Sequence, residues 1–527
     1  MRRGLAGLAL LSLISTARAE TLVMGLAAAP TGLDPHGFIG VGDGTVLTNI
    51  YEPLVRLGAD GTLLPGLATA WTALDEHTWE FTLRRNVTFH DGTSFSAADV
   101  AASYQRVVTL KTSLRGLASR LAAVVAIEQP GPFTLRLHTS LPAPDLPFEI
   151  AAVAILRAAD GELTDATRFN SGERAIGTGP FRFASYTTPG RLELARNPAW
   201  WDTAPVWRSV SLRFIPNDTA RTAALLAGDV DVIERPAARD IPVLSARPGI
   251  TLSQAGAQNA VYLLPNFARD TGGEDITGPA GEPLAENPLR DRRVRLALSL
   301  AIRRDGLADH LLAGAVIPAS QLVPVGSPSH DPSIAVPRAD LARSRALLAE
   351  AGYPNGLRLV LRGPADRITG SPQVLEAIAQ MWSRAGLPTR VETTPYAAHA
   401  LRVARGEFML ALYSCCASMS DGAMVAAALL ATYDASSRRG AGNAGRYSNP
   451  ELDDIVARGL ASFDGSVRRE ASQGAVRLVA REAPLIVLYH PINRWAARAP
   501  IDYIPRQDGR SPAIGARLAT GRTTPDD

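Results

Sequence analysis

The sequence predicts an α/β fold with more than one compact unit. Segments typical of strands alternate with segments typical of helices across residues 340–490, which favours a mixed or parallel sheet covered by helices. The chain has 527 residues, 46% of them hydrophobic and 20% charged. This balance is typical of globular rather than disordered chains, and a chain of this length buries large cores without help from disulfides or metal ions.

The first residues have the pattern of a signal peptide. Arg2 and Arg3 precede an apolar stretch at residues 5–14, which is much shorter than the roughly 20 residues that span a bilayer. Residues 17–19 read Ala-Arg-Ala, so cleavage before Glu20 is expected. No cysteine follows the apolar stretch, which argues against a lipoprotein. The alternative is a buried N-terminal helix. We therefore expect an exported protein.

The charge balance argues against a nucleic-acid partner. There are 54 Lys and Arg residues, of which Lys111 is the only lysine, against 51 Asp and Glu residues. Three of the arginines lie in the predicted leader, so the exported chain is formally balanced. Nucleic-acid binders need an excess basic patch to neutralise phosphates.

Local patterns predict the elements in chain order. Alternating or apolar runs predict strands at residues 21–25, 79–83, 133–137, 210–214, 229–233, 357–361, 389–392, 408–413 and 485–488. Start and stop signals predict helices at residues 97–108, 219–227, 288–302, 340–351, 373–385 and from 450 onward. Ser96 and Asp99 match a capping box, Pro288 stands at the first turn of a helix, and Gly352 and Gly386 end two others.

The usual catalytic motifs are missing from the sequence. It has no G-x-S-x-G elbow, no H-E-x-x-H and no phosphate-binding P-loop. Residues 440–445 match G-x-G-x-x-G literally, but no convincing strand precedes them, so a flexible loop is predicted. The eight histidines are scattered, which makes a dedicated zinc site improbable. We expect a binding protein that has neither cofactor nor metal and is not an enzyme.

Motifs along nearly the whole chain resemble those of one protein family. In order they are Asn49-Ile-Tyr-Glu-Pro-Leu54, Leu64-Pro-Gly-Leu-Ala-Thr-Ala-Trp71, residues 79–92, Phe95-Ser-Ala-Ala-Asp-Val100, Gly177-Thr-Gly-Pro-Phe181, Asn197-Pro-Ala-Trp-Trp201, residues 291–298, residues 446–453 and residues 483–489. Together they resemble the family 5 extracellular solute-binding proteins of ABC importers, the dipeptide, oligopeptide and nickel-binding class.

The resemblance implies a two-lobed periplasmic-binding-protein fold (type II, cluster C-like) with a hinge and an interlobe ligand cleft. After the signal peptide at residues 1–19, lobe I would comprise residues 20–50, 170–262 and 490–527. An inserted subdomain would cover residues 51–169, and lobe II residues 263–489. The resemblance also implies a monomeric periplasmic receptor that delivers a small solute to an ABC permease in the inner membrane.

The resemblance also implies which residues bind the solute. In dipeptide-binding relatives an arginine of lobe II pairs with the ligand carboxylate, and its position here resembles Arg367. An aspartate in a Gly-Trp-x-x-Asp-type segment pairs with the ligand amine. Here Cys415 takes the place of that tryptophan and Ser418 that of the aspartate. A hydroxyl cannot balance a buried ammonium, so free-amine dipeptides should bind poorly unless Asp421 supplies the lost charge. The expected solute is a carboxylate-bearing peptide or peptide-like molecule.

Further candidates surround these positions. The same stretch adds Tyr413, Ser414 and Cys416 to the predicted site, and Cys415 and Cys416 would form either a vicinal disulfide or two buried thiols. The other wall should come from the loop at residues 28–38. There Asp34 is expected to cap a turn, and His36 to lie either in the cleft or on the surface.

Two other functions stay open at this stage. One is a sensory or chaperone-like receptor, which the sequence does not distinguish from an importer component. The other, of a different class, is a secreted hydrolase with an unrecognised triad.

Overall fold

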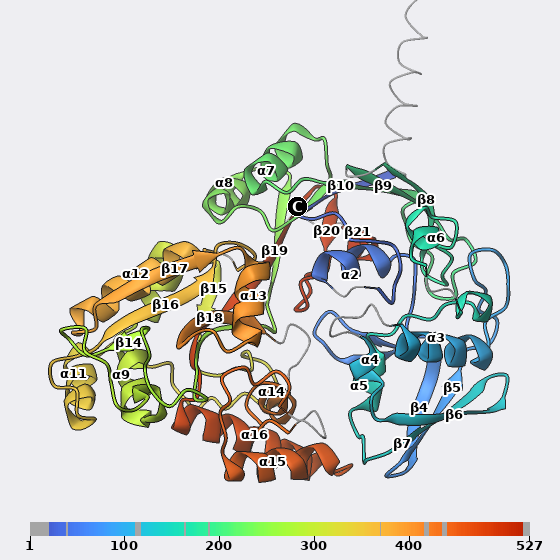
Figure 1. Cartoon of the computed structure of the whole chain (residues 1–527). Helices are drawn as coiled ribbons and strands as arrows, with labels where there is room; N and C mark the ends of the chain where they lie inside the picture. Colours follow the sequence, from blue (N-terminus) through green and yellow to red (C-terminus); the bar gives the residue numbers. More distant parts are fainter. Residues whose placement is uncertain are drawn as a thin grey trace, which may run out of the picture. The chain divides into compact units, whose positions relative to one another are not determined.

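The computed structural model describes residues 21–37, 40–110, 117–162, 165–187, 190–368, 370–415, 421–434 and 440–519. They form two compact units: the first runs up to Ala255 and resumes at Asn493, and the second runs from Gly256 to Ile492 (Figure 1). The boundaries expected from the sequence, 262/263 and 489/490, lie a few residues away. The predicted leader is outside the described residues. Within those residues, no helix has the length and apolar character needed to cross a membrane.

The first unit is built on a mixed sheet whose central strand is parallel to both neighbours. β1 is parallel to β10 and β11, β9 and β8 continue from β10 as an antiparallel hairpin, and the C-terminal end of β19 pairs with β11. The strands are β1 (Thr21–Leu26), β8 (Phe181–Thr187), β9 (Arg191–Arg196), β10 (Ser209–Phe214), β11 (Val232–Glu234) and β19 (Ile486–Arg498). The unit also contains β2 (Val55–Leu57), β3 (Leu63–Pro65), β12 (Ile250–Gly256), β20 (Ile501–Tyr503), β21 (Ala516–Leu518), α2 (Val41–Leu47), α6 (Thr167–Asn170), α7 (Asp218–Ala227) and α8 (Ile241–Ala246).

Within the first unit, a four-stranded antiparallel sheet has a core of its own. The strand order is β4-β5-β7-β6, and Phe81, Leu135 and Leu137 belong to its buried cluster. The elements are β4 (Ala68–Asp75), β5 (Thr78–Leu83), β6 (Val124–Gly131), β7 (Thr134–Thr139), α3 (Ala97–Thr109), α4 (Leu117–Arg120) and α5 (Leu146–Ile150). The capping box predicted at the start of α3 is confirmed, because the Ser96 N–H donates to the Asp99 carboxylate at 2.8 Å.

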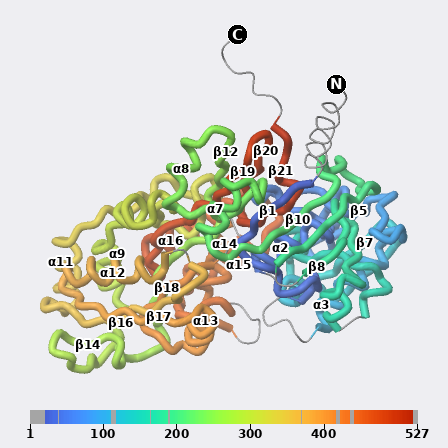
Figure 2. The backbone as a smooth tube through the Cα atoms, turned by 90° about the horizontal axis from the view of Figure 1, so that it is seen from above, coloured from blue at the N-terminus to red at the C-terminus, as the bar shows by residue number. Residues whose placement is uncertain are grey.

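The second unit contains a mixed sheet, as the sequence predicts. β16 is parallel to β17 and β18, while β13 pairs antiparallel with β18 and β19. The strands β16, β17 and β18 lie side by side, with α12 along them (Figures 1 and 2). The elements are β13 (Ala260–Pro265), β14 (Ile276–Thr277), β15 (Val316–Pro318), β16 (Arg358–Pro364), β17 (Thr389–Thr394), β18 (Leu410–Cys415), α9 (Arg292–Leu300), α10 (Arg304–Gly306), α11 (Leu341–Glu350), α12 (Ser371–Arg384), α13 (Tyr396–Ala404), α14 (Gly422–Leu429), α15 (Pro450–Ala461) and α16 (Gly465–Glu482).

Most predicted elements are present within a few residues of their expected bounds, and two differ. The single helix predicted for residues 288–302 is wrong. Asp291 has extended backbone angles and caps a new helix, α9, by accepting from the Arg293 N–H at 2.7 Å, so a short 3-10 turn (Pro288–Arg290) precedes it. The strand predicted at residues 485–488 continues to Arg498.

Three of the sequence motifs meet at one buried carboxyl group in the first unit, and a fourth motif contacts one of these three. Glu52 accepts hydrogen bonds from Thr178 Oγ1 at 3.0 Å, from Trp200 Nε1 at 3.2 Å and from Trp201 Nε1 at 2.9 Å. Burial raises its pKa. His90 belongs to the fourth motif and bonds the same Gly177–Phe181 segment through both ring nitrogens.

Gly177 and Gly179 allow this segment to lie close against the Asn49–Leu54 motif. A β-carbon on Gly177 would lie 2.0 Å from the carbonyl oxygen of Ile50, and one on Gly179 would lie 2.7 Å from that of Asn49. Any larger residue at either position would push the segment away from the Asn49–Leu54 motif. The motif glycines are therefore required by backbone packing.

One arginine of the second unit connects two of the later sequence motifs. Arg295, which is buried, donates to the carbonyl oxygens of Leu289 at 2.8 Å, Glu482 at 2.7 Å and Ala483 at 2.9 Å. Ala483 ends α16 in a left-handed conformation with φ of 47°. Arg295 thus satisfies carbonyl groups that a helix end would otherwise leave unpaired.

Replacing Glu52 by leucine should destabilise the protein by about 3 kcal/mol or more, because two buried donors and one half-buried donor would lose their acceptor. Urea unfolding would measure the loss. The matched control is Glu76→Leu, since Glu76 is exposed and its replacement should stay within about 0.5 kcal/mol of the wild type. Equal losses in the two variants would contradict the proposed importance of the Glu52 cluster.

Candidate functional site

The predicted site residues of the second unit lie at one edge of its sheet. Tyr413, Ser414 and Cys415 form the carboxyl end of β18, and Arg367 follows the carboxyl end of β16. These two strands are parallel neighbours, so their ends reach the same edge. Ligands of open α/β sheets bind outside the carboxyl ends of such strands. Cys416 and Ser418 lie outside the described residues.

Arg367 is exposed and has an unusual backbone conformation. Its φ is 65°, in the left-handed region that few residues other than glycine adopt. Its guanidinium lies over the Tyr396 ring at 5.3 Å, and it has no hydrogen-bond or ion-pair partner among the residues that the structure describes. Strained backbone of this kind concentrates at functional sites, and the role of Arg367 as a ligand contact stays a prediction.

The half-buried end of β18 is fixed by its neighbours. Asn259 Nδ2 donates to Ser414 Oγ at 2.9 Å. The Tyr413 ring lies 6.1 Å from that of His399 and 6.4 Å from that of Tyr262. These contacts give the predicted site an aromatic side formed by Tyr413 and its neighbours.

Asp421 has a structural contact on each carboxylate oxygen. It caps α14 by accepting from the Met424 N–H at 3.0 Å, and it accepts from Ser472 Oγ at 2.6 Å. A carboxylate can accept more than two hydrogen bonds, so these contacts do not prevent Asp421 from also binding a ligand amine. That role stays a prediction.

His36 belongs to a buried network of the first unit. It is 2% exposed, which excludes a surface position. Its Nε2 carries the proton, because it contacts the Ala154 carbonyl oxygen at 2.8 Å, and its backbone N–H donates to Asp34 Oδ1 at 2.9 Å. Burial lowers the pKa of His36 to about 4. A ligand contact of this residue stays a prediction.

Asp34 closes a turn, as expected, and also forms a buried ion pair. Its carbonyl oxygen accepts from the Gly37 N–H at 3.2 Å. Its carboxylate accepts two hydrogen bonds from the Arg106 guanidinium, at 2.9 and 2.6 Å. Because Arg106 belongs to α3, this bidentate pair joins the loop after β1 to the part of the unit that carries the four-stranded sheet.

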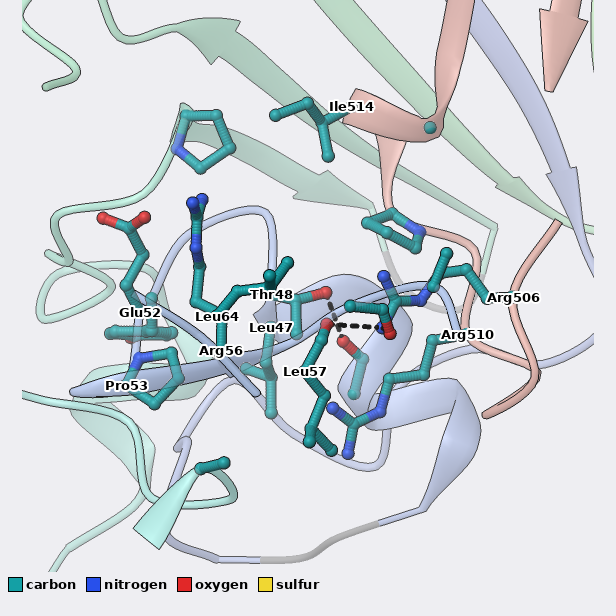
Figure 3. Close-up of a pocket in the computed structure, with 18 of the residues that line it drawn as sticks. Leu47, Thr48, Glu52, Pro53, Arg56, Leu57, Leu64, Arg506, Arg510 and Ile514 are labelled. Carbon is teal, nitrogen blue, oxygen red and sulfur yellow. Dashed lines mark hydrogen bonds between the residues drawn. The ribbon is translucent and has the colours of Figure 1, made fainter. Parts of the chain in front are cut away.

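A cavity of about 390 Å³ lies in the first unit (Figure 3). Its wall combines apolar side chains with the arginines Arg56, Arg506 and Arg510. No sequence pattern predicts this cavity, because its wall comes from distant segments and arginine is the usual cation of the chain. In the described part of the chain, no group of three His, Cys, Asp or Glu side chains is arranged to hold a metal ion.

Comparison with known proteins assigns the family. Residues 62–437 match the family model described as bacterial extracellular solute-binding proteins, family 5 Middle. The chain belongs to this family. It is similar to the periplasmic murein peptide-binding protein MppA of Escherichia coli, with 25% identity over 501 residues that cover 90% of this chain and 89% of MppA. It is also similar to the probable D,D-dipeptide-binding periplasmic protein DdpA of Escherichia coli, with 24% identity over 482 residues, 89% of this chain and 88% of DdpA.

Solved structures confirm the fold class of this family 5 protein. The periplasmic binding protein DppA from Helicobacter pylori, in complex with the peptide STSA, has a TM-score of 0.77 at 20% identity and covers 96% of this chain and 100% of its own. The unliganded open form of MppA has a TM-score of 0.76 at 23% identity, with 95% and 97% covered. The α/β, two-lobed periplasmic-binding-protein fold expected from the motifs is therefore correct.

The stability of this family 5 protein should fall in acid in part because of His36. The unfolded histidine takes up a proton below about pH 6.5, whereas the buried one does so only near pH 4. The stabilising contribution is therefore complete above pH 6.5 and is lost as the pH falls towards 4, by up to about 3 kcal/mol. Urea unfolding should show a gap between the wild type and His36→Gln that narrows from pH 7.5 to pH 4.5.

The control for this titration is His310→Gln, because His310 is exposed. It should follow the wild type at every pH. A gap between wild type and His36→Gln that stays constant with pH would show that His36 is not held neutral in the folded state.

Proposed function

We propose that this protein is the periplasmic receptor of an ABC importer and captures a carboxylate-bearing peptide or peptide-like solute. Family membership supports the receptor role. Two relatives are named for murein peptide and D,D-dipeptide binding, and a similar structure holds the peptide STSA. Closure of two lobes around a ligand is a common working step of such receptors and would let a membrane permease distinguish loaded from empty protein.

Arg367 carries the proposal about ligand chemistry. Its exposed guanidinium stands at the carboxyl edge of the sheet with no partner among the described residues, and a planar guanidinium can hold a carboxylate through two parallel hydrogen bonds. On this proposal Arg367 anchors the carboxylate. Tyr413, Ser414 and Cys415 line the site beside it.

The proposed site would bind the free amine of a peptide weakly. The proposal takes Ser418 to occupy the position of the family's acidic anchor, and Asp421 already accepts two hydrogen bonds. The preferred solute therefore lacks a free amine or carries a blocked one. The protein works without catalysis, as a monomer with no nucleic-acid partner and no resident cofactor. Turnover of peptide or ester substrates by the purified protein would contradict this part.

Three forms of one dipeptide test the ligand chemistry: Ala-Ala, N-acetyl-Ala-Ala and the amide Ala-Ala-NH2. We expect the acetylated form to bind best in calorimetry, because it keeps the carboxylate and removes the ammonium. The amide should bind worst. Micromolar binding of free Ala-Ala, or an amide that binds as well as the acetylated peptide, would contradict the proposal.

Replacing Arg367 by alanine should weaken binding of N-acetyl-Ala-Ala by at least about 30-fold, since losing a paired charge costs about 2 kcal/mol or more. Arg367→Lys should recover only part of the affinity, because an ammonium lacks the planar fork. The control is Arg338→Ala, since Arg338 is exposed in a loop of the same unit. Unchanged affinity in Arg367→Ala would remove the carboxylate anchor.

A further inference from the structure

None of the residues that line the cavity of the first unit is a predicted ligand residue of the second unit. Its wall comes from α2, from the hairpin of β2 and β3, and from the segment that follows β20 (Figure 3). All of its lining residues belong to the first unit. A ligand bound here would therefore need no contact with Arg367 or with the end of β18.

The size and the wall of the cavity suit a small apolar molecule. Its volume of about 390 Å³ is within the range of small-molecule sites, whereas packed protein interiors contain few voids larger than a water molecule. The apolar part of the wall includes Leu47, Leu57, Leu64, Ile504, Ile514 and four prolines. Removing such surfaces from water would stabilise an apolar ligand.

Two of the cavity's arginines are already neutralised. Arg56 pairs with Asp202 at 3.0 Å. Arg506 pairs with Asp508 at 2.7 Å and donates to the carbonyl oxygens of Leu57 and Gly58. The charges of these two arginines are thus balanced by neighbouring carboxylates.

Arg510 is different. It is only partly exposed, and its guanidinium has no hydrogen-bond or ion-pair partner within the described ranges. Its backbone N–H donates to Asp508, but that carboxylate is held by the Arg506 side chain. Gly44 on α2 makes room for it, since a β-carbon there would lie 2.6 Å from Arg510 Nε. Burial lowers the pKa of Arg510, which reflects the cost of a cation without a partner.

The acidic groups that the structure describes near the cavity do not pair with the Arg510 guanidinium. Asp202 and Asp508 are paired with other arginines. Glu52 lines the cavity, but its carboxyl accepts from Thr178, Trp200 and Trp201. Arg517 also lines it and is exposed, so water can solvate its charge.

We propose that this cavity is a second binding site, which takes a small apolar monocarboxylate whose head group pairs with Arg510. A single guanidinium matches a carboxylate in charge and in its two parallel donors. A doubly charged phosphate would leave one of its charges unpaired, because Arg56 and Arg506 are already paired with Asp202 and Asp508. The apolar body of the ligand would lie against the leucine, isoleucine and proline side chains.

Calorimetry with octanoate tests this site on the full exported chain. We expect one octanoate per protein, with binding at least ten-fold weaker in Arg510→Met and undetectable binding of octan-1-ol, which lacks the charge. Arg510→Met should fold, because the guanidinium makes no hydrogen bond that the fold would lose. Arg367→Ala should bind octanoate like the wild type, so failure of this site and failure of the proposed peptide site can be told apart.

A second variant guards against a folding defect in Arg510→Met. Ile514→Trp keeps Arg510 and fills part of the cavity, so it should also weaken octanoate binding. Absence of octanoate binding to the wild type would overturn the proposal. So would equal binding by the wild type, Arg510→Met and Ile514→Trp, or equal binding of octanoate and octan-1-ol.

Discussion

The first unit depends on one buried carboxyl group. Glu52 is the common acceptor for Thr178, Trp200 and Trp201, which lie more than a hundred residues further along the chain. A buried acceptor facing three donors is costly to break, because each donor would lose its partner away from water. The cluster holds the Asn49–Leu54, Gly177–Phe181 and Asn197–Trp201 motifs together, and they in turn form one wall of the cavity.

These contacts explain why the sequence motifs identify the family but do not identify the ligand. The motifs that carry the resemblance make contacts within each unit: Glu52 gathers those of the first, and Arg295 bonds the ends of α16 and of the 3-10 turn in the second. Such contacts define the architecture. Arg367 has no comparable contact among the described residues, which agrees with its proposed role as the carboxylate anchor.

Local signals predicted most of the fold. The capping box of Ser96 and Asp99 marks the start of α3, as predicted. Gly352 and Gly386, with φ of 95° and 90°, follow the ends of α11 and α12 as expected. The prediction failed where a side chain changes the backbone, since Asp291 divides the expected helix at residues 288–302. It also missed the length of β19, because His490, Asn493 and Arg494 interrupt its apolar run.

The candidate site was predicted from motif positions. The cavity could not be, since only the folded chain brings residues 44–64 and 504–517 together.

The proposed function requires that the protein binds a carboxylate-bearing solute. The most direct measurement is mass spectrometry of small molecules released by denaturing the protein purified from its native host. We expect a peptide or peptide-like molecule that has a free carboxylate and no free amine, and we expect it to be absent from the Arg367→Ala variant. A released ligand that has no carboxylate, or one retained fully by Arg367→Ala, would contradict it.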